Sequence, residues 1–276
     1  MAAFVLCTLG DLLLDVIVRL VDPLEPGTDA AAETRTTAGG QAANVAAWAA
    51  TLGAEARFVG KRGNDPAGAL AAAELKRRDV AVLGPVANGR NGIVVALIGS
   101  DGDRAMATDR GVAPTLSPNE LDVRWFEGCS HLHLSGYSVM STPIDEAAAR
   151  AAKLVREQGG GVSVDLASSR VIRDFGRKQL RRVIDRLRPD VVFANEQERD
   201  AFGALDGAGG TWVLKRGAAG CAIERAGKRT EFDAVPAEVV DTTGAGDAFA
   251  AGYLVGGVQL ALETAARCVA RLGAVP

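Results

Sequence analysis

The sequence has few cysteines and few histidines, and neither kind is arranged as a metal site requires. The four cysteines are far apart and form no C-x-x-C pair. We therefore expect small buried thiols in a reducing compartment, and neither a disulfide framework nor a zinc site. His131 and His133 alternate on a predicted strand and face one side, but no further ligands stand near them, so a metal ion is not expected there.

An excess of basic residues is also lacking, because the formal net charge is −3. This balance argues against nucleic acid or an anionic membrane as the main partner. The N-terminal segment is apolar but has no basic region before it, and Asp11 and Asp15 interrupt it before it could span a bilayer. The expected product is a soluble, cytoplasmic protein.

Neither an internal repeat nor a low-complexity linker divides the chain. From Ser117 onward predicted strands and helices alternate, which indicates βα units and a mainly parallel sheet covered by helices. Two earlier groups of strands, at about 13–38 and 90–110, cannot easily join that sheet. The second group is a hairpin around "DGD" at 101–103. We predict one α/β domain over residues 1–276, with these strands forming a small β-sheet lid.

The stretch "EVVDTTGAGDAFAAG", residues 238–252, runs from an apolar segment predicted as a strand into an alanine-rich helix. No GK[ST] follows, and Phe249 stands where a dinucleotide fingerprint has its third glycine, so neither of those motifs is present. Gly244, Ala245 and Gly246 have so little side chain that their backbone N–H groups can approach an anion closely. Together with the positive end of the helix dipole, they would suit the charge of a phosphoryl group in transfer.

Asp247 adds a carboxylate beside this predicted anion site, where it would repel phosphate. A carboxylate at this position has a role if Asp247 faces the hydroxyl of a second substrate and removes the proton of that hydroxyl, as a catalytic-base aspartate does in phosphoryl transfer. The alternative is that Asp247 only caps the helix. The sequence of this turn alone leaves both roles open for Asp247.

"DTTGAGD" at 241–247, followed by "AFAAGYL", resembles the C-terminal signature of the ribokinase-like (PfkB) family of carbohydrate and nucleoside kinases. "GGQAANVA" from Gly39, continuing to Gly53 and Gly63, resembles the N-terminal signature, and "NEQE" at 195–198 is similar to the N-x-x-E motif. The resemblance runs from Gly10 to about Ala274. It implies a ribokinase-like fold and an ATP-dependent kinase that transfers the γ-phosphoryl group to a hydroxyl of a small sugar or sugar derivative.

The resemblance also implies roles for individual residues on the phosphate side. Asp247 would be the base, and Gly244, Ala245 and Gly246 the anion hole. Asn195 and Glu198 would hold Mg²⁺ through water, which suits an ion that dehydrates reluctantly. ATP would be bound by residues of "KRGAAG" and of the signature turn, namely Lys215, Gly217, Gly220 and Thr243. Asp241 and Thr243 lie where many relatives bind a monovalent cation such as K⁺; ordinary turns are the alternative for both segments.

Acceptor binding is expected from the N-terminal part of the chain. Asp15 stands five residues after Gly10, as the acceptor-binding aspartate of the family does, and a carboxylate can accept two hydroxyl hydrogen bonds from a polyol. Gly39 and Gly40 would allow close backbone approach, and Asn44 can both donate and accept. A solvent-facing strand residue is the alternative for Asp15.

Departures from the family pattern leave the acceptor open. Leu13 in "GDLLLD" stands where ribokinase proper has a sugar-binding asparagine, and these apolar residues would suit a nucleoside base. A nucleoside (adenosine-type) kinase is therefore the alternative function, and a non-catalytic sugar-binding sensor a weaker one. Arg104 and Arg110 are expected to be solvated, with an acidic or phosphorylated acceptor as the alternative. The exposed edge of the lid would allow a homodimer.

Overall fold

The computed structural model describes residues 4–99, 104–203 and 210–276. Its larger sheet has nine strands in the order β15-β14-β13-β12-β11-β10-β1-β4-β6, in which only β14 runs antiparallel to its neighbours, β13 and β15. The strands are β1 (Val5–Leu9), β4 (Glu55–Val59), β6 (Val80–Leu83), β10 (His131–Ser135), β11 (Gly161–Asp165), β12 (Val191–Asn195), β13 (Thr211–Lys215), β14 (Cys221–Arg225) and β15 (Lys228–Phe232).

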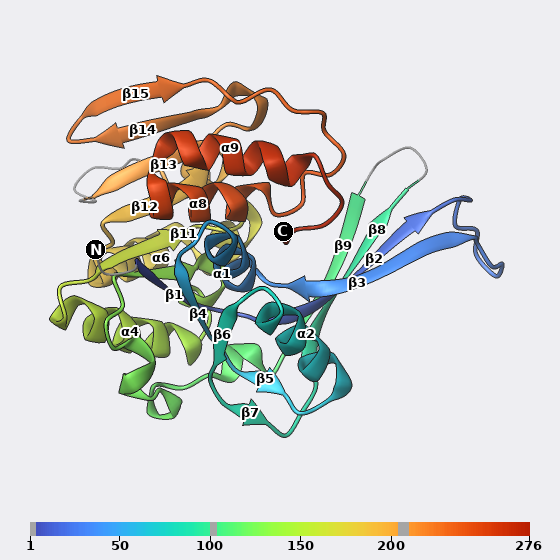
Figure 1. Ribbon diagram of the computed structural model, residues 1–276, viewed down its shortest axis with the longest axis horizontal. Coiled ribbons are helices and arrows are strands. Elements are labelled where there is room, and N and C mark those ends of the chain that lie inside the picture. The colour runs from blue at the N-terminus through green and yellow to red at the C-terminus, as the bar shows by residue number, and fades with distance from the viewer. Residues whose placement is uncertain (1–3, 100–103, 204–209) are drawn as a thin grey trace.

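Helices cover both faces of this sheet, as the alternation of strands and helices predicts (Figure 1). Neighbouring residues of β1 belong to different apolar clusters: Leu6 to the cluster that contains residues of α1, α8 and α9, and Cys7 to the cluster that contains residues of α4 and α6. The helices are α1 (Gln41–Thr51), α2 (Pro66–Lys76), α3 (Gly136–Val139), α4 (Ile144–Glu157), α5 (Ser169–Phe175), α6 (Arg177–Leu187), α7 (Glu196–Phe202), α8 (Ala245–Gly256) and α9 (Val258–Val269).

A separate four-stranded sheet extends to one side of the larger one (Figure 1). Its order is β3-β2-β8-β9, and the two predicted strand groups supply its strands: β2 (Leu13–Leu20), β3 (Ala32–Gly39), β8 (Asn91–Ile98) and β9 (Arg104–Gly111). The residues 101–103 of the predicted hairpin turn lie outside the described residues. A two-stranded ladder of β5 (Arg62–Gly63) and β7 (Val86–Ala87) completes the pairing.

The prediction of a strand at 238–240 is wrong. The chain has no regular element between Phe232, where β15 ends, and the start of α8. Val239 and Val240 are 63% and 58% exposed, so their apolar character does not reflect burial in a sheet. The backbone N–H groups of Val240 and Asp241 instead donate to Val269 O at the end of α9, at 2.8 and 3.2 Å.

The four cysteines are free and buried, as predicted. His133 is fully buried, its Nδ1 lies 2.9 Å from Ser163 Oγ, and burial lowers its pKa to about 3. Within the described ranges, no cluster of three or more histidine, cysteine or acidic residues is arranged to hold a metal ion. Among the same residues, no helix has both the length and the apolar character needed to cross a membrane.

Candidate active site

The predicted anion-binding turn precedes α8 and is fixed by contacts with distant residues. Gly244 occupies the N-cap position with φ of +75°, and a Cβ there would lie 2.6 Å from Ala274 Cα. Only glycine meets both conditions without strain. Asp241 Oδ1 accepts bonds from the backbone N and hydroxyl of Thr243, at 2.8 and 2.6 Å, while Asp241 Oδ2 accepts from Gly273 N at 3.0 Å.

Asp247 lies in the first turn of α8 and is joined to a residue 203 positions earlier in the chain. Asn44 Nδ2, on α1, donates to Asp247 Oδ2 at 2.8 Å. The two helices pack through small side chains such as Ala248 and Ala47, which are fully buried. The N-cap of α8 is Gly244 rather than Asp247, so the helix is not capped by this carboxylate.

The environment of Asp247 disfavours its ionised form. Burial raises its pKa to about 7; the charge of Asp165 acts in the same direction, whereas the bond from Asn44 and the charge of Lys215 oppose it. Protein therefore surrounds the carboxylate closely, yet the residue keeps part of its surface exposed. A carboxylate that is half protonated near neutral pH and still accessible is suited to accept a proton from a ligand.

The side chain of Asp15 on β2 lies against Gly39 on β3, although Asp15 is in register with Thr37. A Cβ at position 39 would lie 1.9 Å from Asp15 Oδ1, so the carboxylate occupies the space that the missing side chain leaves. Asp15 is 7% exposed, and burial raises its pKa to about 6. Two buried acceptors, Asp15 Oδ1 and Asn44 Oδ1, have no hydrogen-bond partner within the described part of the chain. Unpaired buried acceptors are costly unless a ligand supplies the donors.

Gly40 is the N-cap of α1 with φ of +98°, and a Cβ there would lie 2.3 Å from the backbone oxygen of Asp11. The side chain of Asp11 forms a two-pronged ion pair with Arg110 on β9, through Nε at 2.5 Å and Nη2 at 3.0 Å. Arg110 also donates to Tyr137 O at 3.2 Å. The expectation that Arg110 is solvated is therefore wrong, because its side chain is only 25% exposed. The side chain of Arg104 lies outside the described part of the structure.

Asn195 and Glu198 stand at the junction of β12 and α7 and bond to each other. Glu198 N donates to Asn195 Oδ1 at 2.9 Å, while the backbone and side-chain nitrogens of Asn195 donate to the two oxygens of Glu198 at 2.9 and 2.8 Å. Burial raises the pKa of Glu198, and the charge of Lys215 partly offsets this. Each carboxylate oxygen keeps further lone pairs, so the pair suits a metal ion held through water.

Lys215, at the end of β13, points toward the same region. Its Nζ donates to Asp165 Oδ2 at 2.5 Å, and a Cβ on Gly246 would lie 3.2 Å from that nitrogen. No role was predicted for Asp165, which ends β11. Gly217 and Gly220 instead form a short turn with positive φ, closed by Arg216 N on Gly220 O at 2.8 Å.

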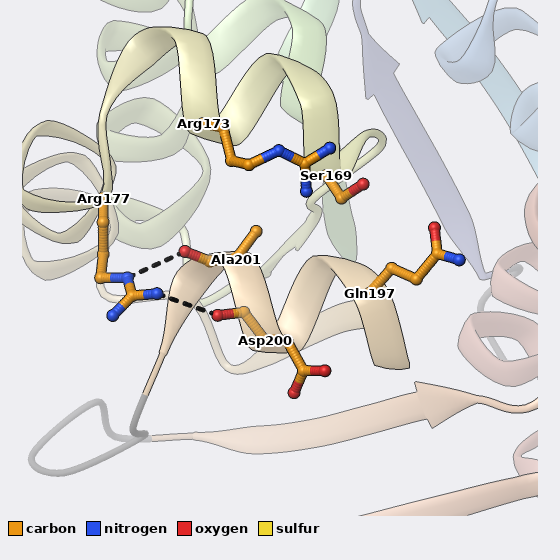
Figure 2. Close-up of a pocket in the computed structure, with 6 residues that line it drawn as sticks. All are labelled: Ser169, Arg173, Arg177, Gln197, Asp200 and Ala201. Atoms are coloured by element: carbon orange, nitrogen blue, oxygen red, sulfur yellow. Dashed lines mark hydrogen bonds between the residues drawn. The ribbon is translucent and has the colours of Figure 1, made fainter.

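A surface cavity of about 650 Å³ lies elsewhere, between α5 and α7. Figure 2 shows Arg177 beside the end of α7, where it donates to Ala201 O and Asp200 O at 3.0 and 3.1 Å. None of the residues predicted for the site lines this cavity. The predicted residues come together elsewhere. Asn44 contacts Asp247 in the first turn of α8, and Lys215, at the carboxyl end of β13, lies beside Gly246.

Comparison with known proteins gives this geometry a context. Residues 5–275 match the model of the family described as pfkB family carbohydrate kinase. The chain belongs to this family. It is a carbohydrate kinase, a phosphotransferase that uses an alcohol group as acceptor.

Relatives of this carbohydrate kinase act on several acceptors. An ATP-dependent ribose-1-phosphate kinase of Halopiger xanaduensis is 32% identical, over 92% of this chain and 86% of its own length. Fructokinase-1 of Oryza sativa subsp. japonica is 29% identical, over 78% and 72%.

Solved structures confirm the ribokinase-like fold. The adenosine kinase of Sinorhizobium meliloti has a TM-score of 0.85 at 23% identity, covering 100% of this chain and 96% of that one. An E. coli protein provisionally called ribokinase II, in complex with ATP and Mg²⁺, has a TM-score of 0.81 at 23% identity, covering 98% and 94%.

Proposed function

We propose that this carbohydrate kinase transfers the γ-phosphoryl group of ATP to a hydroxyl of a small sugar or sugar derivative, with Asp247 as general base. The observation that carries the proposal is the carboxylate of Asp247, held by Asn44 at 2.8 Å and given a pKa of about 7 at the start of α8. A proton acceptor with a pKa near the working pH is the most effective general base.

The acceptor is proposed to lie between Asp15, Asn44 and Asp247. The unpaired oxygens of Asp15 and Asn44 would accept hydroxyl hydrogen bonds, which orient the sugar so that one remaining hydroxyl faces Asp247. Asp247 would then remove the proton of that hydroxyl as its oxygen bonds to the γ-phosphorus, while the bond from that phosphorus to the bridging oxygen breaks and ADP leaves. Holding both reactants in place in this way accounts for a large part of the expected acceleration.

The phosphates are proposed to lie on the other side of Asp247, against the backbone N–H groups of Gly244, Ala245 and Gly246. The amides and the helix dipole would stabilise the negative charge that is spread over the group in transfer. When bound with ATP, Mg²⁺ supplies further positive charge to the phosphates. Asn195 and Glu198 would hold it through water.

The small sheet is proposed to act as a lid over the acceptor. Asp15 and Gly39 belong to this sheet, and Arg110 on β9 ties it to Asp11 in the segment between β1 and β2. A lid that excludes water would prevent hydrolysis of ATP in place of transfer to the sugar.

A panel of acceptors with release of ADP as the readout tests the proposal. It should contain fructose, ribose, adenosine and ribose 1-phosphate, the last because of the relative from Halopiger xanaduensis. Release of ADP that depends on one sugar or sugar phosphate is expected. A sensor, by contrast, would bind a sugar without releasing ADP.

Adenosine is kept in the panel because the fold is shared with adenosine kinases. The leucines that suggested a base pocket are used in packing, however. Leu12 is fully buried in the core, and a Cβ on Gly92 would lie 2.3 Å from Leu13 Cδ2. The nucleoside kinase is therefore the less favoured function.

The pH dependence of the reaction should report Asp247. Because only the ionised carboxylate can accept the proton, kcat/KM for the acceptor is expected to fall about tenfold per unit below a pKa near 7 and to stay level above it. The pH profile of the Asp15→Asn variant is measured alongside, because this variant lacks the second carboxylate whose pKa is raised. A midpoint at pH 5 or lower would contradict the assignment of Asp247.

Replacing Glu198 by glutamine should raise the Mg²⁺ concentration needed for half-maximal activity by about 10-fold, as expected for loss of a carboxylate that orients the metal's shell. A Mg²⁺ titration of turnover measures this. Glu196→Gln is the matched control, since Glu196 is in the same helical turn but is exposed. An unchanged titration for Glu198→Gln would count against the metal assignment.

Three further features stay predictions of the sequence. Asp241 and Thr243 are predicted to bind K⁺, although the hydrogen bonds of Asp241 already explain its place in the turn. A homodimer through the small sheet and a cytoplasmic location are the others.

A further inference from the structure

Three adjacent parallel strands in the interior of the large sheet have polar side chains at their carboxyl ends. They are Asp165 on β11, Asn195 on β12 and Lys215 on β13, and Asn195 is directly in register with Lys215. Asn195 has a proposed role toward the metal and Lys215 toward ATP. Asp165 has none so far, although its side chain is fully buried.

Asp165 is held from two sides. Its Oδ1 accepts from Ala167 N at 3.1 Å, and its Oδ2 accepts from Lys215 Nζ at 2.5 Å. The lysine side chain is 16% exposed, so the ammonium has been largely removed from water. A flexible four-carbon side chain would not stay in one place without such a partner, because lysine loses much rotamer entropy when it is fixed.

The fixed ammonium lies beside the predicted anion hole. A Cβ on Gly246 would be 3.2 Å from Lys215 Nζ, so the nitrogen lies over the first turn of α8. An ammonium has three N–H donors, and the bond to Asp165 uses one. The others are left for an anion that lies against the backbone of residues 244–246.

We propose that Asp165 is a positioning residue that holds the Lys215 ammonium over the anion hole, where it contacts the γ-phosphoryl group of ATP. This inference rests on the proposed function. Lys215 touches the substrate, whereas Asp165 acts only through Lys215.

The charges around Lys215 agree with this role. Burial alone would lower the pKa of the lysine, but the carboxylates of Asp165, Glu198 and Asp247 raise it, so the ammonium stays charged. Without Lys215, the phosphates would meet these three carboxylates and lose the positive charge of this ammonium. A charged donor aimed at the group in transfer is worth more in a partly buried site than in water.

A double-mutant cycle separates positioning from an independent role. Lys215→Met is expected to lower kcat about 100-fold, as does the loss of one preorganised donor. Asp165→Asn should lower it at least tenfold, because the ammonium is no longer held. In the Lys215→Met background, Asp165→Asn should cause no further loss. Two exposed residues, Asp174 in α5 and Lys178 in α6, provide the control substitutions Asp174→Asn and Lys178→Met, which should leave kcat unchanged.

A binding measurement tests the same contact without turnover. Calorimetry should show that Lys215→Met and Asp165→Asn weaken binding of Mg²⁺ and AMP-PNP about tenfold or more, while ADP binding stays the same. The double variant should match Lys215→Met. Lys215→Arg keeps a charge that can pair with Asp165, so its affinity for AMP-PNP should lie between those of Lys215→Met and wild type. This variant tests the contact even if Asp165→Asn does not fold.

Other results would overturn the proposal. A tenfold loss on Asp165→Asn that persists in the Lys215→Met background would give Asp165 a role of its own, and a shift of the Mg²⁺ titration would make it a metal ligand. Equal losses for AMP-PNP and ADP would exclude the γ-phosphoryl contact. If wild type releases no ADP with any acceptor, the proposed function fails, but the two nucleotide affinities still decide whether Lys215 and Asp165 act together.

Discussion

Replacement of Asp247 by asparagine is expected to lower kcat by about two to four powers of ten, the range found for loss of a general base. The amide has nearly the same shape and can still accept the bond from Asn44, but it cannot take a proton. Affinity for ATP should change little, because the proposed phosphate contacts come from the backbone of residues 244–246 and from Lys215. Steady-state turnover together with calorimetric ATP binding measures both quantities.

The stability of the same variant serves as its control. The pKa of Asp247 is raised in the folded protein from 3.8 to about 7, so the stability that its protonated form provides is lost as pH rises through that interval. Asparagine does not ionise, and the melting temperature of the variant should equal or exceed that of wild type at pH 8, with the difference shrinking toward pH 4. Turnover within tenfold of wild type would remove Asp247 from the mechanism.

Gly39→Ala is expected to raise KM for the acceptor by about 100-fold with little effect on ATP binding. The added Cβ would lie 1.9 Å from Asp15 Oδ1, so the Asp15 carboxylate must move away from the proposed sugar site. Loss of hydrogen bonds to a charged group costs about 1.5–3 kcal/mol each, and 1.4 kcal/mol corresponds to a factor of ten. Initial-rate kinetics with the acceptor identified by the panel measure the change.

Two variants show whether Gly39→Ala acts through Asp15. A Cβ on Gly128 would meet nothing within 4 Å, so Gly128→Ala should cost only about 1 kcal/mol of stability for its left-handed φ and leave KM alone. Adding Gly39→Ala to Asp15→Ala should change KM little, because the clashing carboxylate is already gone. A KM for Gly39→Ala close to that of wild type would contradict the proposed sugar site.

Features that depend on local pattern could be predicted from the sequence. The unbroken apolar run at the N-terminus forms β1 at Val5–Leu9, buried on both faces. Pro66 marks the first turn of α2. Local hydrophobicity gave a wrong prediction of a strand at 238–240. The valines there are exposed, and the backbone is hydrogen-bonded to the end of α9.

Contacts between distant segments could not be predicted from spacing. The bonds from Asn44 to Asp247 and from Lys215 to Asp165 join residues 203 and 50 positions apart. They form because neighbouring parallel strands end at one edge of the sheet and because α1 packs on α8, and neither adjacency follows from sequence order. The pairing of Asp11 with Arg110 depends in the same way on where the small sheet meets the large one.

The turn before α8 depends on residues that are synthesised well after it. Asp241 accepts from Gly273, which comes 32 positions later, and Gly244 lies against Ala274, whose carbonyl also holds the indole N–H of Trp48. On the ribosome, every strand that the structure describes in the large sheet has been made by Phe232, yet the turn before α8 gains these supports only after residue 274 has left the exit tunnel. Nucleotide binding at the proposed anion hole should therefore need the segment around Gly273 and Ala274, and not the large sheet alone.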